Sequence, residues 1–347
     1  MEEKTAAKVN KFGKVGASIE DEAYFGRKDL EVVEIKNGVT AIGARAFENC
    51  TALESIVIPD SVATIAPDAF DGCVRLEKIG YSGPACRFEG GAMLSADGTR
   101  LLRWMGWLPE YAKAATVPDS VTVVEDKAFM VSRELESVRL PEGVTAIGEY
   151  AFSWCSALKS VVIPEGVKKI GRIAFWGCSA LKSLVIPGSV TTIGPSAFSG
   201  CTALKSVAIS EGVTAIGGWA FQSCTSLEEI VIPGRVTEIG REAFRACKAL
   251  RSIAIPVSVT EIGWSAFCGC KALREIVLPG NLKRIGDNAF NGTGLRTVTV
   301  PASVESIGSA AFAECGDLET AVLPAGLEAT MTNQFKDCPK LKEILRY

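Results

Sequence analysis

The chain has 347 residues, of which 48% are hydrophobic and 22% are charged, so it falls in the globular range and is long enough for two ordinary domains or one repeat array. Its 37 Lys and Arg against 40 Asp and Glu give a net charge of −3, which argues against nucleic acid or an anionic membrane surface as a partner. Histidine is absent, and with it the commonest general base and metal ligand, so we expect no enzyme, no metal site and no cofactor.

The first 18 residues lack the pattern of the rest of the chain, and we expect residues 1–18 to cap the fold or to fray. From Ile19 onward an aromatic residue returns every 23 residues, with one interval of 22 residues and one of 59 residues. Such a short fixed period predicts a solenoid, in which each unit buries its apolar side on its neighbours. The thirteen aromatic positions are Tyr24, Phe47, Phe70, Phe129, Phe152, Phe175, Phe198, Phe221, Phe244, Phe267, Phe290, Phe312 and Phe335.

Residues 174–196 show how one unit is expected to fold. The alternation of apolar residues over 181–186 predicts a strand, and Pro187 ends it because proline cannot donate to a β-ladder. A shorter extended segment follows and ends at Gly194, which suits a turn that needs a positive φ. The stretch 174–178 predicts a single helical or 3₁₀ turn on the outer side. Equivalent strands of successive units are expected to pair in parallel and in register.

The long interval contains an insertion. Asp97-Gly98 lies between two apolar stretches, which is a strong hairpin signal, so residues 80–116 are predicted to form an inserted hairpin. Residues 117–347 then continue the repeat without a break, and we treat 1–347 as a single domain. The insertion is either a packing element or an arm that contacts a ligand through Trp104, Trp107 and Tyr111.

The repeat unit A-F-x-x-C-x-x-L-x-x-I-x-I-P-x-x-V-x-x-I-G, present here as AFSWCSALKSVVIPEGVKKIG, closely resembles the BspA-type (treponemal) leucine-rich repeat. The resemblance covers nearly the whole chain from about Ile19. It implies a leucine-rich-repeat solenoid, which we predict to be right-handed, with a parallel β-sheet on the concave face and short turns or 3₁₀ helices on the outer side. It also implies binding without chemistry, because many members of that family are bacterial or protist surface proteins implicated in adhesion.

The cysteines follow the repeat. Ser132 and Thr293 fill the same position in other units, so the pattern predicts a ladder of small residues under the turn. Parallel Cβ vectors on stacked units fit disulfide geometry poorly, and we therefore expect buried free thiols. Ten of the twelve cysteines share this position: Cys50, Cys73, Cys155, Cys178, Cys201, Cys224, Cys247, Cys270, Cys315 and Cys338.

One candidate binding surface is the outward face of the long strands. Apolar residues at one outward position form a stripe that includes Val162 and Val185. An adjoining row carries Lys159, Lys182 and Lys205, and Arg251 and Arg274 extend it. A contiguous exposed apolar surface usually marks a contact site, whereas β-branched residues also simply favour strand formation.

The other candidate surface is the turn around each Ala-Phe pair. Its aromatic residues stand where other units carry Ser, Glu, Asp, Arg or Gly, so the repeat does not require them. Trp and Tyr often dominate the binding energy of interfaces; the alternative is that each ring lies flat on its neighbouring unit. These residues are Tyr150, Trp154, Trp176, Trp219 and Trp264.

We therefore expect a non-enzymatic binding module for a protein or glycan ligand, at the cell surface or secreted. No apolar run approaches the roughly 20 residues that span a bilayer, so we expect no direct membrane insertion. The start of the chain lacks the apolar core of a signal peptide, as it would if the signal had been trimmed. One alternative is a cytoplasmic scaffold for protein–protein interaction, and another is a structural protein that self-associates through the C-terminal edge at residues 345–347.

Overall fold

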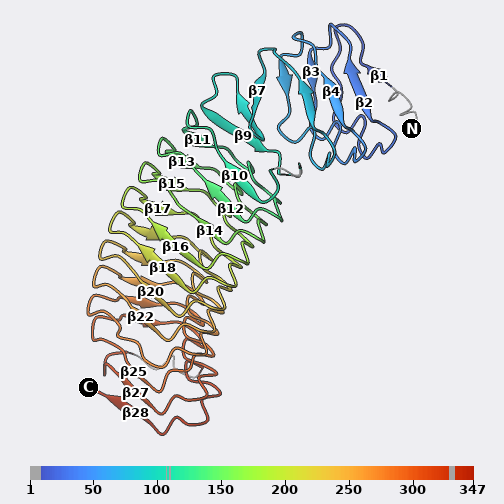
Figure 1. Cartoon of the computed structure of the whole chain (residues 1–347). Helices are drawn as coiled ribbons and strands as arrows, with labels where there is room; N and C mark the ends of the chain where they lie inside the picture. The colour runs from blue at the N-terminus through green and yellow to red at the C-terminus, as the bar shows by residue number, and fades with distance from the viewer. Residues whose placement is uncertain (1–8, 107, 109–110, 328–332) are drawn as a thin grey trace.

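The computed structural model describes residues 9–106, 108, 111–327 and 333–347. They form a long, curved stack of rungs that advances from the N-terminal to the C-terminal end (Figure 1). Each rung has three sides, which are a long strand, a short strand and a turn segment. The predicted leucine-rich-repeat solenoid with parallel strands and 23-residue units is confirmed. Its third side is built from turns, since no α-helix or 3₁₀ helix occurs in the described residues.

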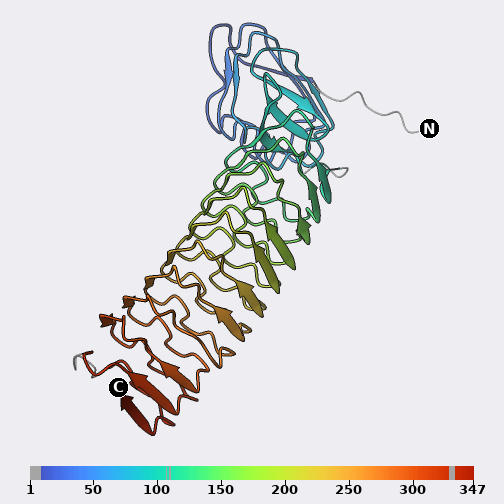
Figure 2. The same cartoon turned by 90° about the vertical axis from the view of Figure 1, so that its left-hand side faces the viewer.

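The long strands come from the L-x-x-I-x-I segments and pair in parallel, one repeat apart. Ser183 pairs with Ser206, and along β16 the residues are alternately exposed and buried. Figure 2 shows these strands as arrows along one side of the stack. They are β1 (Val9–Phe12), β2 (Val32–Ile35), β4 (Ser55–Val57), β6 (Lys78–Gly80), β10 (Ala114–Thr116), β12 (Ser137–Arg139), β14 (Ser160–Val161), β16 (Ser183–Ile186), β18 (Ser206–Ile209), β20 (Glu229–Val231), β22 (Ser252–Ala254), β25 (Thr297–Thr299), β27 (Thr320–Leu323) and β28 (Glu343–Arg346).

The short strands come from the V-x-x-I-G segments, and all except the last, whose Ile307 is only partly buried, contribute one buried residue, usually Ile. They are β3 (Ala41–Ile42), β5 (Thr64–Ile65), β11 (Val123–Val124), β13 (Ala146–Ile147), β15 (Lys169–Ile170), β17 (Thr192–Ile193), β19 (Ala215–Ile216), β21 (Glu238–Ile239), β23 (Glu261–Ile262), β24 (Arg284–Ile285) and β26 (Ser306–Ile307). The glycine that follows them is not explained by a positive φ, as the sequence suggested, because Gly194 does not adopt one. A Cβ at Gly194 would lie 2.7 Å from the carbonyl carbon of Gly171, so close approach of adjacent rungs requires glycine there.

The turn segments form a third ladder between rungs. The amide of Phe152 donates to Ala174 O at 2.7 Å, and the amide of Trp154 donates to Trp176 O at 2.7 Å. Rungs that another turn segment follows have left-handed backbone two residues before and two residues after Phe, as at Tyr150 (φ 57°) and Trp154 (φ 62°); Asp68 and Asn333, in rungs without such a successor, do not adopt it. Side chains at these positions leave the core, which explains why their identity varies.

The core of each rung is built around the repeated Phe and Cys. Phe198 lies between Phe175 and Phe221, with ring centroids 5.3 and 5.4 Å apart. The thiol of Cys178 donates to Phe152 O in the previous rung at 3.2 Å, and the same contact recurs along the array. All twelve cysteines are free thiols, and none forms a disulfide. A small side chain that can donate to a carbonyl is therefore what this position requires.

Residues 80–116 interrupt the stack and divide its core into two clusters. The strands β7 (Cys86–Glu89), β8 (Ala92–Ser95) and β9 (Arg100–Trp104) are antiparallel, and β9 then pairs in parallel with β11. The Asp97-Gly98 turn connects β8 to β9. A second, tight turn at Gly90-Gly91, both with positive φ, connects β7 to β8 and was not predicted. Side chains of β8 alternate between the two clusters, since Met93 enters the N-terminal one and Leu94 the C-terminal one.

Trp104 takes the place of the repeated Phe at the head of the C-terminal stack. Its ring lies 5.6 Å from that of Phe129, and the residue is 1% exposed. Tyr111 packs edge-on against it at 5.9 Å. Trp107, the third aromatic residue of the expected arm, lies outside the described residues. Trp104 is therefore part of the core, and this favours the packing role of the insertion at this residue.

Candidate functional site

Two clusters of aromatic and arginine side chains lie on the turn side of the array, outside the core. We call them together the aromatic–arginine face. Trp154 and Trp264 are exposed, at 43% and 39%, and the other aromatic members are half-buried. The face consists of Tyr150, Trp154, Arg172, Trp176, Trp219, Arg241 and Trp264.

The first cluster joins two adjacent rungs. The guanidinium of Arg172 lies over the ring of Tyr150, 5.0 Å from its centroid. Trp154 meets Trp176 edge-on, with centroids 4.7 Å apart and ring planes at 72°. A Cβ at Gly177 would lie 3.2 Å from the indole of Trp154, so the absence of a side chain there lets that ring lie close to the next rung. The rings are held by their neighbours and keep one side open to solvent.

The second cluster is a stack of two indoles on one guanidinium. Arg241 lies 4.3 Å from the ring centroid of Trp219 and 4.9 Å from that of Trp264. Beside it, Glu242 is almost completely buried and accepts from Arg245 Nη1 at 2.7 Å and from Gln222 Nε2 at 3.0 Å. Cation–π contacts of this kind fix otherwise mobile side chains in one arrangement.

The outward face of the long strands carries the apolar stripe expected from the sequence. Val185, Ala208 and Val231 are successive partners in the sheet. Val162 and Val185 are 74% and 62% exposed. The stripe is thus a row of small apolar side chains that continues from rung to rung.

The basic row beside this stripe is shorter than the sequence suggested. Lys159 pairs with Glu136 and holds the pKa of that carboxyl below its ordinary value. Arg251 pairs with Glu228 at 3.5 Å. Within the part of the chain that the structure describes, the cations without an ion pair in this row are Lys182 and Lys205.

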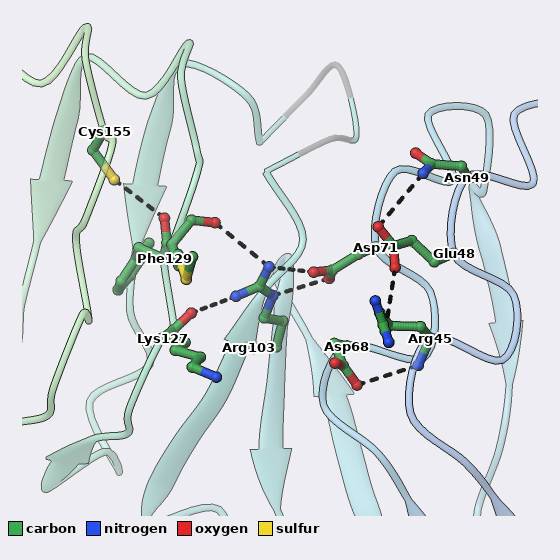
Figure 3. Close-up of polar contacts among 10 residues, drawn as sticks. Arg45, Glu48, Asn49, Asp68, Asp71, Arg103, Lys127, Phe129 and Cys155 are labelled. Carbon is green, nitrogen blue, oxygen red and sulfur yellow. Dashed lines mark hydrogen bonds and ion pairs between the residues drawn. The ribbon is translucent and has the colours of Figure 1, made fainter. Parts of the chain in front are cut away.

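A cavity of about 1100 Å³ opens where the stack is interrupted, between the turn segments of the Phe70 and Phe129 rungs (Figure 3). Arg103 of β9 crosses it. Its Nε donates to Asp71 Oδ1 at 2.9 Å, and its Nη2 pairs with Asp71 Oδ2. On the other wall the same guanidinium donates to Lys127 O and, at 3.5 Å, to Met130 O. Arg103 therefore holds the two walls together at a fixed separation.

The N-terminal wall of this cavity is acidic. Burial raises the pKa of Asp71 above its ordinary value, although Arg103 opposes the shift. Burial also raises the pKa of Glu48, and the Asp71 charge adds to the effect. Glu48 Oε2 is buried and makes no hydrogen bond within the described residues; its ion-pair contact is Arg45 Nε at 4.0 Å.

Sequence reasoning did not find this cavity or the roles of Glu48, Asp71 and Arg103. The available signal was the 59-residue interval itself, since an insertion deprives the rungs on both of its sides of a neighbour. Which side chains then meet across the gap depends on the path of β9, and the repeat pattern carries no information about that path.

Within residues 9–106, 108, 111–327 and 333–347, no group of three or more His, Cys, Asp or Glu side chains is placed to hold a metal ion. In the same segments, no helix has the length and apolar character needed to cross a membrane.

A family model described as the BspA type leucine rich repeat region matches the chain in six copies, over residues 17–88, 122–251 and 237–345. No curated protein gives a significant match. Among solved structures, a leucine-rich repeat protein from Bacteroides ovatus is 27% identical, with 98% of this chain and 92% of that chain covered and a TM-score of 0.66.

Two more solved structures share the fold. A leucine-rich repeat protein from Eubacterium ventriosum is 22% identical, with 88% of this chain and 90% of that chain covered and a TM-score of 0.52. The pneumococcal vaccine antigen PcpA is 19% identical, with 69% of this chain and 72% of that chain covered and a TM-score of 0.51. Because the family model spans well over half of the residues, this chain belongs to the BspA-type leucine-rich repeat family.

Proposed function

We propose that this chain is a non-catalytic binding module that contacts a protein ligand through the aromatic–arginine face. The leucine-rich repeat family is suited to protein–protein interaction. The observation that carries the proposal is the placement of Trp, Tyr and Arg at positions that the repeat leaves free. These are the residue types most enriched among the energetic anchors of interfaces, and here they are already ordered by contacts with one another.

The aromatic–arginine face is a better candidate than the strand face. Val185 and the other stripe residues have an explanation without a ligand, because β-branched residues favour a pleated, half-buried surface. No comparable local preference explains an indole in the left-handed conformation of Trp154 or Trp219, where Gly, Asn and Asp are the residues normally enriched.

The test is a screen of the purified chain against immobilised extracellular proteins and glycans, repeated with variants that borrow residues from other rungs. Trp154→Gly, Trp176→Ser and Trp219→Ser each introduce a residue that another rung carries at the same position, as in Gly177, Ser199 and Ser196. Folding should therefore be retained. Each change is expected to weaken binding of the selected protein by about tenfold, which corresponds to a loss of ~1.4 kcal/mol of binding free energy.

The matched controls lie on the strand face. Val185→Ala copies Ala208, and Lys182→Glu copies Glu228. Both should bind the ligand as the unchanged chain does. If the three tryptophan variants bind normally and the two controls do not, the strand face is the contact surface. Selection of a glycan instead of a protein would reassign the ligand class.

We propose a location at the cell surface or outside the cell, with the cytoplasm as the alternative. Support comes from the resemblance to a family in which many members are surface proteins. Protease treatment of intact source cells, followed by immunodetection of the chain, distinguishes the two. Loss of the signal supports the surface, whereas full protection until lysis places the protein inside.

Self-association is a second proposal, favoured by the free edge of β28 (Glu343–Arg346). All four of its residues are exposed, including Ile344 and Leu345, and in the described residues its strand partner is β27. An exposed apolar edge is a template for pairing with another chain. Light scattering over a concentration series should show growing assemblies, and Leu345→Lys should abolish them; a monomer at all concentrations would exclude this proposal.

A further inference from the structure

The interruption leaves one side of the turn ladder without partners. In the preceding rung, the amide of Phe47 donates to Ala69 O at 2.8 Å and that of Asn49 to Asp71 O at 2.7 Å. The equivalent amides of Phe70 and Gly72, together with that of Asp68, donate to no acceptor within the described residues. They occupy alternate positions along the turn segment, as the free donors of an edge strand do.

The opposite wall carries a carbonyl acceptor that lacks the amide donor of a preceding rung. In a continuous rung, the carbonyl one residue after Phe accepts from the rung before it, as Trp176 O does from the amide of Trp154 at 2.7 Å. The equivalent carbonyl of Met130 receives no backbone amide in the described part of the chain and has only the long 3.5 Å contact from Arg103. Donors on one wall and an acceptor on the other thus face the space of a missing rung.

The cavity in this space is lined by Asp68, Gly72 and Met130 and measures about 1100 Å³. Arg103 spans the cavity and, through its hydrogen bonds to both walls, fixes the distance between them. Glu48 also lines it, and its buried Oε2 lacks a hydrogen-bond donor within the described residues. An occupant that satisfies all of these groups must offer carbonyl acceptors, amide donors and a side-chain donor for Glu48, for which Lys and Arg are suited because their hydrogen bonds to a carboxylate are charge-assisted.

We infer that this cavity is a second binding site, separate from the aromatic–arginine face, which takes an extended peptide segment of a partner protein with a Lys or Arg side chain directed at Glu48. The peptide carbonyls accept from the amides of Asp68 and Gly72, and a peptide amide donates to Met130 O. The segment takes the place of the absent turn, in the manner of strand addition to a free edge.

The first experiment selects short random peptides displayed on phage against the intact chain. Enriched peptides should carry Lys or Arg, and their synthetic copies should bind about tenfold more weakly to Glu48→Gln than to the unchanged chain, since a hydrogen bond to a charged group is lost. Gln stands at the equivalent position in Gln222, so the variant should fold. Glu165→Gln, in an exposed turn, is the matched control and should bind normally.

Amide hydrogen exchange gives the second readout. In the free chain the amides of Asp68 and Gly72 should exchange much faster than those of Phe152 and Trp154, which are paired. A bound peptide should slow exchange at Asp68 and Gly72 and leave Trp154 unchanged. Absence of enriched peptides, or peptides that leave these two amides unprotected, overturns the inference.

A double variant separates this site from the proposed function. Trp154→Gly combined with Trp219→Ser should bind the selected peptides as tightly as the unchanged chain does. If the tryptophan changes abolish peptide binding while Glu48→Gln does not affect it, the peptides occupy the aromatic–arginine face and the cavity is not their site.

Discussion

Single residues in this chain divide into those that the rung needs and those that it tolerates. The repeated Phe and Cys are buried in the continuous array, except in the last rung, where Phe335 and Cys338 are only partly buried. The position two residues after Phe is left-handed, and it accepts Gly177, Trp154 or Val131 without a change in the ladder. A substitution is therefore costly or neutral according to its place in the repeat rather than its chemical type.

Phe198→Ala should cost roughly 3 to 5 kcal/mol of unfolding free energy, because it removes a fully buried ring from the interior of the stack. The surrounding rings cannot collapse into the space, since each is held by its own rung. Trp176→Ser, at a half-buried turn position, should cost less than about 1 kcal/mol. Urea denaturation of the two variants measures both, and similar losses would contradict this division of roles.

The buried thiols should make the fold sensitive to alkali. Burial raises the pKa of Cys201 and Cys247 from an ordinary value near 9 to about 12. Between these values the folded chain keeps protons that the unfolded chain releases, so the unfolding free energy falls as the pH rises from about 9 to about 12. Urea midpoints over this range should therefore decrease.

Cys201→Ser is the control for that experiment. Serine does not ionise in this range, and Ser132 occupies the same position in another rung. Lys and Tyr residues are identical in the two chains, so the difference between their pH profiles reports the thiol. If the midpoints of both chains fall equally, ionisation of Cys201 does not contribute.

At the scale of elements, strands and turns were predictable to different degrees. The alternation of apolar and polar residues in 181–186 predicts β16, because successive side chains of a strand point to opposite faces of the sheet. The left-handed turn was not predictable, since Ile173 and Val131 adopt it although β-branched residues disfavour it. The insertion was recognised as a hairpin from Asp97-Gly98, but its pairing with β11 depends on contacts far apart in sequence.

Arg103 should be the most important polar residue of the insertion. Its side chain and that of Asp71 are only 12% and 21% exposed, so Arg103→Ala leaves a carboxylate and two carbonyls without their donor. The expected loss of unfolding free energy is about 2 to 4 kcal/mol. Arg139→Ala breaks an exposed pair with Asp119 and should cost less than about 1 kcal/mol. Equal losses in denaturation experiments would argue against a bridging role.

At the scale of the whole molecule, the chain is two stacks joined by the insertion. The N-terminal stack runs through Phe12, Tyr24, Phe47 and Phe70, and the C-terminal one begins at Trp104. The sequence predicted the inserted hairpin at 80–116, but a sequence repeat does not reveal whether the rungs on its two sides still share one core. The aromatic–arginine face belongs entirely to the C-terminal stack, and the cavity lies at the junction.

The two stacks should unfold at different denaturant concentrations. Stability in a linear array grows with the number of neighbour contacts, and the N-terminal stack has far fewer rungs. Five of the six tryptophans, all except Trp107, are placed by the structure in the C-terminal stack, so fluorescence reports mainly that stack, whereas far-ultraviolet circular dichroism reports both. The circular dichroism transition should therefore begin before the fluorescence transition. Coincident curves would mean that the insertion couples the stacks into one cooperative unit.

The one-repeat register between neighbouring rungs also has a genetic consequence. Adjacent rungs share their repeated residues, so we expect similar coding sequences, between which unequal recombination would add or remove a whole unit at a time. Because the backbone ladders join each rung only to the rungs before and after it, the product keeps every ladder intact. Such an event between Trp176 and Trp219 would change the distance between the two aromatic clusters by one rung. The spacing of contact residues can thus evolve by duplication and deletion, independently of the residues that hold the array together.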